Sequence, residues 1–145
     1  MAEIGDWVIV TLSSGLELSA TKRDEGKWYI YYRDKNGNLV QLTDEWGNQI
    51  YLEITSAGRK AIRNGEEGEE GIIEKALKDT TPSLSEDGNT YYIGIGSYKK
   101  GGDIYAYNYM GIAKIQKDNV SITTTTTTTQ GPELTGGAKG EEKAD

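Results

Sequence analysis

Short runs of β-branched and aromatic residues, separated by tight turn signals, constrain the fold of this chain more than any other feature. Within several runs, apolar and polar residues alternate with the period of a half-buried strand. Five such runs lie in the first part of the chain: Trp7–Leu12, Leu16–Lys22, Trp28–Arg33, Leu39–Thr43 and Gln49–Ile54. The connections between them are short, and parallel pairing needs long crossovers. We therefore expect an antiparallel meander.

A helical insert is predicted after these strands. Ser56–Asn64 has the character of a short helix or turn, and Gly71–Asp79 places its apolar residues at helical spacing. Between them, Glu66–Gly71 is acidic and interrupted by glycine, which predicts a loop. Strands are expected to resume at Thr90–Tyr98 and again within Ile104–Gln116.

The whole pattern predicts one domain followed by an arm. Residues 1–122 should form a mainly β domain, an antiparallel β-sandwich or small barrel of about seven to eight strands. The helical insert lies at about 56–79, and residues 123–145 form a Thr-rich, extended C-terminal arm or tail. The predicted core includes Val8, Val10, Leu16, Leu18, Ile30, Ile50, Leu52, Ile93 and Ile95.

Seven consecutive threonines, Thr123–Thr129, open this arm. Threonine is β-branched and favours extended backbone, but the run has no apolar face that would form a core of its own. It is therefore either a solvated linker or an arm that becomes ordered on a partner. Our hypothesis is that Val120–Leu134 docks on the open sheet edge of a neighbouring subunit, and that Pro132, which donates no backbone hydrogen bond, ends the pairing.

The composition argues against an enzyme. The chain has no histidine and no cysteine, which excludes disulfides, thiol nucleophiles and Ser-His-Asp triads. No nucleophile motif is present either. We expect no catalytic residue, no cofactor and no resident metal ion.

The formal net charge of −7 disfavours binding to DNA or RNA, which requires basic patches. An acidic surface can also mimic nucleic acid, so an inhibitor of this kind is a minor alternative. No signal peptide is visible, and no apolar stretch approaches the roughly 20 residues of a membrane span. We expect a soluble protein made in the cytoplasm, with a virion or another assembled particle as its destination.

Three segments are candidate ligand sites. Asp34–Glu45 has oxygen side chains at EF-hand-like spacing, but Leu39 stands where glycine is needed, so a hairpin at Asn36-Gly37 is favoured. The glutamates of Glu66–Gly71 could gather a cation, although such charge runs are usually solvated. Gly94-x-Gly96 matches no phosphate-loop spacing, and glycine in a strand more often marks a bulge or a close backbone approach.

The strongest candidate for an interaction site is a tyrosine face. Tyr105, Tyr107 and Tyr109 alternate along one predicted strand and are expected to share one side of it. They are interpreted either as an aromatic sheet core or as a surface that binds protein or sugar. Together with the threonine run Thr123, Thr124, Thr125, Thr126, Thr127, Thr128 and Thr129, they form the predicted interaction set.

These observations predict a non-enzymatic structural protein, a small subunit or accessory protein of a virus particle or a surface filament. Its partner would be protein, either copies of itself or another assembly subunit. The alternative is a β-module that binds carbohydrate or peptide through a tyrosine-rich sheet face.

Overall fold

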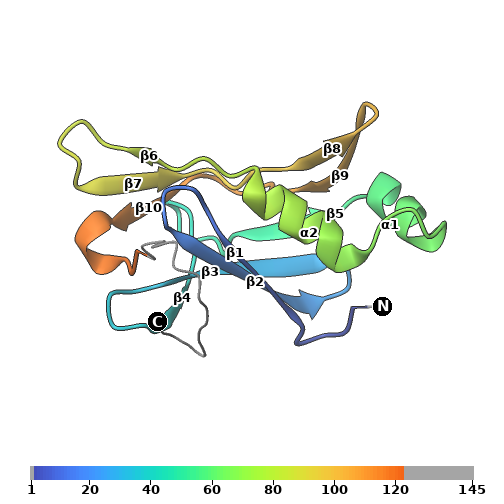
Figure 1. The fold of residues 1–145 in the computed structure, drawn as a ribbon, viewed down its shortest axis with the longest axis horizontal. Coiled ribbons are helices and arrows are strands. Elements are labelled where there is room, and N and C mark those ends of the chain that lie inside the picture. Colours follow the sequence, from blue (N-terminus) through green and yellow to red (C-terminus); the bar gives the residue numbers. More distant parts are fainter. Residues whose placement is uncertain (1, 123–145) are drawn as a thin grey trace, which may run out of the picture.

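The computed structural model describes residues 2–122, which fold into antiparallel β-sheets with two short helices (Figure 1). The mainly β fold class predicted from the sequence is therefore confirmed. The helices are α1 (Ser56–Arg63) and α2 (Glu69–Lys78), and a 3-10 turn, η1, spans Lys117–Asn119. The strands are β1 (Trp7–Thr11), β2 (Glu17–Asp24), β3 (Lys27–Arg33), β4 (Leu39–Gln41), β5 (Tyr51–Ile54), β6 (Ser83–Leu84), β7 (Thr90–Ile93), β8 (Tyr98–Lys100), β9 (Asp103–Tyr107) and β10 (Ala113–Gln116).

The larger sheet has the strand order β1-β2-β3-β5-β9-β8 and curls into a half-barrel (Figure 1). Strands β1, β2 and β3 form the expected meander. The next two strands depart from it, because both pair with β3: β4 lies opposite Tyr31–Arg33, and β5 lies opposite Lys27–Tyr29. Between them the chain forms a hairpin of its own, in which Thr43 pairs with Gln49.

A smaller sheet, in the order β10-β7-β6, lies beside the β8–β9 hairpin along the upper side of Figure 1. Residues of both sheets and of α2 belong to one hydrophobic core. Ile95 is only partly buried at the margin of this core. The other predicted core residues are buried: Val8, Val10, Leu16, Leu18, Ile30, Ile50, Leu52 and Ile93.

The two helices pack on the core side of the larger sheet. The apolar residues of α2 that were predicted from helical spacing, including Ile72, Ile73 and Leu77, are fully buried. Helix α2 begins at Glu69, two residues before Gly71, so part of the predicted acidic loop is helical. Helix α1 is capped by Thr55, whose Oγ1 accepts a hydrogen bond from the Gly58 amide at 3.1 Å.

Two hairpin turns share the pattern Asp-x-x-Gly-Asn and the same geometry. In Asp34–Asn38, the Gly37 amide donates to the Asp34 carbonyl, and the Asp34 amide donates to the Asn38 carbonyl. The Asp34 carboxylate also accepts hydrogen bonds from the amides of Asn36 and Asn38, both at 2.9 Å. Asp44–Asn48 repeats this arrangement. Both are three-residue loops closed by a left-handed glycine, not the two-residue turn that Asn36-Gly37 alone suggests.

Replacing Gly37 with valine should destabilise the domain by about 1–2 kcal/mol, because a β-branched residue is strained in the left-handed region. Gly37 has φ of 82°, and nothing within 4 Å would contact an added Cβ, so backbone strain is the only cost. Gly37→Asn is the matched control and should cost a fraction of this, since asparagine tolerates the conformation. Thermal melting of the two variants would show this difference, and equal melting temperatures would contradict the assigned turn.

The predicted strand Thr90–Tyr98 is interrupted. Strand β7 ends at Ile93, and Tyr98 begins β8, which belongs to the other sheet. The predicted Ile104–Gln116 segment is likewise divided, into β9 and β10. Both segments therefore cross between the two sheets, which strand propensity alone does not reveal.

Val120 is 7% exposed and forms an isolated bridge with Asp34, and Ile122 forms one with Leu16. The hypothesis that the docking arm begins at Val120 is therefore wrong at its start, because residues 120–122 pack on their own domain. The rest of that segment, including Thr123–Thr129, lies outside the described residues.

Candidate interaction surface

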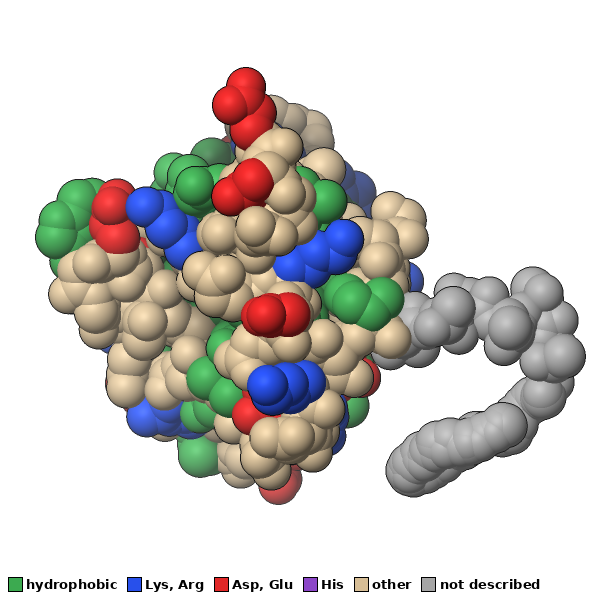
Figure 2. Space-filling model, turned by 90° about the vertical axis from the view of Figure 1, so that its left-hand side faces the viewer, with side chains coloured by type: hydrophobic (Ala, Val, Ile, Leu, Met, Phe, Trp, Pro, Cys, Tyr) green, Lys and Arg blue, Asp and Glu red, His purple; other side chains and the backbone are tan. Residues whose placement is uncertain are grey.

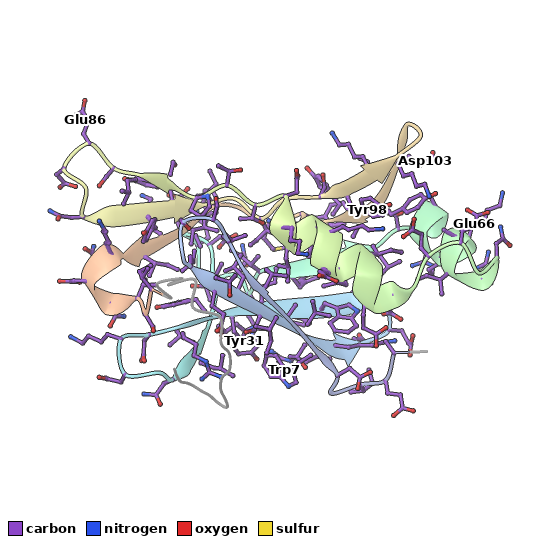
Figure 3. All side chains as sticks on the ribbon, in the orientation of Figure 1. Trp7, Tyr31, Glu66, Glu86, Tyr98 and Asp103 are labelled. Atoms are coloured by element: carbon purple, nitrogen blue, oxygen red, sulfur yellow. The ribbon has the colours of Figure 1, made fainter. Side chains whose placement is uncertain are left out.

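One face of the larger sheet points away from the core and carries most of the aromatic side chains of β1, β3 and β5. In β3, Trp28 is buried while its neighbour Tyr29 is half-buried, and this alternation continues along the strand. We define the aromatic face by its outward residues Trp7, Ile9, Tyr29, Tyr31 and Tyr51. Figure 3 shows Trp7 and Tyr31 on the opposite side of the sheet from α2.

The strand register brings these rings together. Trp7 pairs with Thr21, Thr21 with Tyr29, and Tyr29 with Tyr51, so these residues form one row across four strands. The ring centroids of Tyr29 and Tyr51 are 5.0 Å apart, and those of Trp7 and Tyr31 are 5.4 Å apart. Thr21 is only 6% exposed, because it is short and lies between larger side chains.

Two cations border the aromatic face. The guanidinium carbon of Arg23 lies 4.4 Å from the centre of the Tyr29 ring, and Arg23 Nη1 donates a hydrogen bond to the Tyr31 hydroxyl at 3.2 Å. Lys27 Nζ lies 5.5 Å from the centre of the Tyr51 ring. The surface thus combines tryptophan, tyrosine and arginine, which are enriched at protein interfaces, with one lysine at its margin.

The structure divides the tyrosines that were predicted to share a face. Tyr105 is 9% exposed and belongs to the core, whereas Tyr107 and Tyr109 are 41% and 58% exposed. The cause is a shift in register between β8 and β9: Tyr98 pairs with Ala106 and Lys99 with Ile104, so Tyr105 has no partner in β8. A bulge of this kind turns two successive residues toward the same side. Tyr107 and Tyr109 remain together, with ring centroids 4.9 Å apart.

Two glutamates of the acidic run, Glu67 and Glu69, have buried side chains that anchor the fold, whereas Glu66 and Glu70 are exposed. Glu69 is 9% exposed and accepts hydrogen bonds from Lys22 Nζ at 3.1 Å and from Trp28 Nε1 at 2.8 Å. Burial lowers the pKa of Lys22, but the hydrogen bond and charge of Glu69, with a smaller contribution from Glu25, raise this pKa above its ordinary value. The carboxylate therefore ties the start of α2 to β2 and β3.

Glu67 makes a second buried anchor, with a side chain that is 6% exposed. It accepts hydrogen bonds from the Tyr98 hydroxyl at 3.0 Å and from Lys75 and Lys100 at 3.2 Å each. Burial raises the pKa of Glu67, but the hydrogen bonds from Lys100, Lys75 and Tyr98 outweigh this effect and leave its pKa below the ordinary value. Glu67 thus joins the α1–α2 connection to β8, near the labelled Tyr98 in Figure 3.

A small hollow of about 190 Å³ opens between the β2–β3 turn and α1. Lys22, Glu69, Glu25, Arg59 and Arg63 contribute its charged groups. Lys22 is paired with both glutamates, and Arg59 Nη1 donates to the Ile54 carbonyl at 2.9 Å. Most of these groups therefore already have partners within the protein.

Figure 2 shows acidic side chains interspersed with lysine and arginine on the end of the molecule that it faces. Within residues 2–122, no group of three or more acidic side chains is placed to hold a metal ion. The Asp34 carboxylate, at the first position of the EF-hand-like spacing, instead accepts hydrogen bonds from its own turn.

Comparison with protein families, curated proteins and solved structures finds no match to this chain. Neither described helix is long and apolar enough to cross a membrane.

Proposed function

We propose that this chain is a non-enzymatic subunit of a larger assembly, such as a virus particle or a surface filament, and that it binds neighbouring subunits through the aromatic face. The observation that carries the proposal is the solvent-facing aromatic sheet surface. Ile9 and Trp7 are 59% and 44% exposed, although apolar side chains of this size gain about 25 cal/mol for each Å² removed from water. A protein partner would bury that area and leave Arg23 and Lys27 at its rim.

The orientation of the rings favours a protein partner over carbohydrate. The Trp7 and Tyr31 rings are inclined by 56°, and the Tyr29 and Tyr51 rings by 33°. A sugar ring stacks best on a flat aromatic surface, whereas interdigitating side chains of a protein can fill the steps between tilted rings. The charged groups that line the hollow near Lys22 also support a non-enzymatic role. Most of them are paired with other groups of the protein and stabilise the fold.

The experiment compares variants of the full chain by sedimentation velocity from about 1 µM to about 1 mM, a range that covers weak to moderate association. The double variant Tyr29→Ser/Tyr51→Ser should weaken assembly at least tenfold, which is about 1.4 kcal/mol. Trp46→Ser is the matched control, since Trp46 is 73% exposed and lies on a turn outside the aromatic face. Its assembly should be unchanged.

Thermal melting of the same samples separates assembly from folding. Both variants should keep a cooperative transition. A wild-type chain that stays monomeric over the whole range, or a Trp46→Ser variant that weakens assembly as much as the double variant, would contradict the proposal.

A further inference from the structure

Strand β1 is an open edge of the larger sheet. It pairs with β2, and within residues 2–122 no strand pairs with its other side. The Lys22 amide donates to the Asp6 carbonyl and the Leu12 amide to the Leu16 carbonyl, which fixes the alternation of the ladder. By this alternation, the backbone groups of Trp7, Ile9 and Thr11 point away from the sheet.

Helix α2 packs against β1, but the sequence of this edge lacks the charges and proline that protect many natural edge strands. The sequence of β1, Trp-Val-Ile-Val-Thr, has no charge and no proline, and its register with β2 is continuous. The opposite edge, β8, contains Lys99 and Lys100 and an irregular register with β9. An uncharged, regular edge with exposed Trp7 and Ile9 is suited to accept another strand.

We propose that the β1 edge of one copy accepts Thr123–Thr129 of a second copy as an added antiparallel strand. The inference rests on the proposed function and names its contact. The seven threonines are β-branched and uncharged, and their number is sufficient to cover the five residues of β1. Gly131-Pro132 follows, and proline ends strand pairing because it has no N–H to donate.

The position of Ile122 favours a second copy over the same chain. Ile122 forms an antiparallel bridge with Leu16, the residue just before β2. The chain at Ile122 therefore runs opposite to β2 and in the same direction as β1, which is antiparallel to β2. Pairing with its own β1 would require an immediate reversal. Thr123–Thr129 contains no Gly, Pro, Asn or Asp, the residues that make tight turns.

Cysteine cross-linking tests this contact directly, because the chain contains no cysteine of its own. Full-length Ile9→Cys is mixed, under mild oxidation, with full-length chains that each carry one cysteine, at Thr124, Thr125, Thr126, Thr127 or Thr128. Because strand side chains alternate between faces, disulfide-linked pairs should form at every second arm position. Trp46→Cys in place of Ile9→Cys is the control and should show no such alternation.

Two results would overturn the inference. One is an equal cross-linking yield at all five arm positions. The other is a disulfide that forms within a single chain when Ile9→Cys and an arm cysteine are combined, but not between chains.

A second measurement separates this contact from the proposed function. Thr11→Lys places a charge on the edge but outside the aromatic face and should weaken assembly at least tenfold, whereas Trp46→Lys, on a turn away from this edge, should leave it unchanged. If assembly resists Thr11→Lys but is weakened by Tyr29→Ser/Tyr51→Ser, the β1 contact is wrong and the aromatic face stands. If the wild-type chain never assembles, the proposed function fails, and the contact fails with it.

Discussion

Replacing Glu69 with alanine should destabilise the fold by roughly 3–5 kcal/mol, because it leaves a buried ammonium group without its main partner. Lys22 is 2% exposed, and its Nζ donates to Glu69 Oε1 at 3.1 Å. Trp28, which is fully buried, would lose the acceptor of its indole N–H as well. Glu25 also lies 3.4 Å from Lys22 Nζ, but its side chain is 88% exposed and replaces Glu69 only in part.

Two further variants test the cause of this loss. Lys22→Met/Glu69→Gln removes both charges and keeps an acceptor for Trp28, so it should recover most of the stability. Glu74→Ala breaks an exposed pair with Lys78 on the same helix and should change the stability by no more than about 0.5 kcal/mol. Urea unfolding followed by tryptophan fluorescence measures all three variants. A Glu69→Ala chain within about 1 kcal/mol of wild type would show that the buried pair does not anchor α2.

The strands and turns near the start of the chain could be predicted because their signals are local. Asp34–Asn38 carries both the carboxylate that organises its turn and the glycine that closes it. Alternation in β1 likewise identified Val8 and Val10 as core. The pairing of both β4 and β5 with β3 could not be predicted from local signals. It depends on which strand of the folded sheet still has an unpaired edge.

The candidate site was harder to predict because aromatic residues occupy both faces of β3. Trp28 and Tyr32 are buried, while Tyr29 and Tyr31 are half-buried. Because residues on both faces are aromatic, the sequence indicates a strand but does not show which face is exposed to solvent. Tyr105 points inward because of a bulge, which depends on the neighbouring strand β8.

The burial of Glu67 and Glu69 within the acidic run could not be predicted for a similar reason. The residue that neutralises Glu69 is Lys22, which lies 47 positions earlier in the chain. No local pattern connects the two. An inward-facing lysine within an otherwise apolar strand face is the signal that could have indicated a buried acidic partner.

Gly94 and Gly96 lie in one short segment, but replacing each with alanine should affect the stability of the domain differently. Gly96→Ala should destabilise the domain by about 2–3 kcal/mol, because the added methyl overlaps the end of α2. A Cβ at Gly96 would lie 2.7 Å from the carbonyl carbon of Asp79, 2.8 Å from the Asp79 Cβ and 2.9 Å from the Ala76 carbonyl oxygen. Backbone atoms of a helix cannot move aside without disturbing the buried face of that helix.

Gly94→Ala is the matched control, since the nearest atom to a Cβ there is Ile112 Cγ1 at 3.8 Å, an ordinary contact. Neither glycine has a left-handed φ, so alanine brings no backbone strain at either position. Gly94→Ala should be neutral or slightly stabilising, because alanine reduces the conformational freedom of the unfolded chain. Denaturant unfolding of both variants decides the matter: equal stabilities would mean that the chain does not pass this closely over α2 where it crosses from β7 to β8.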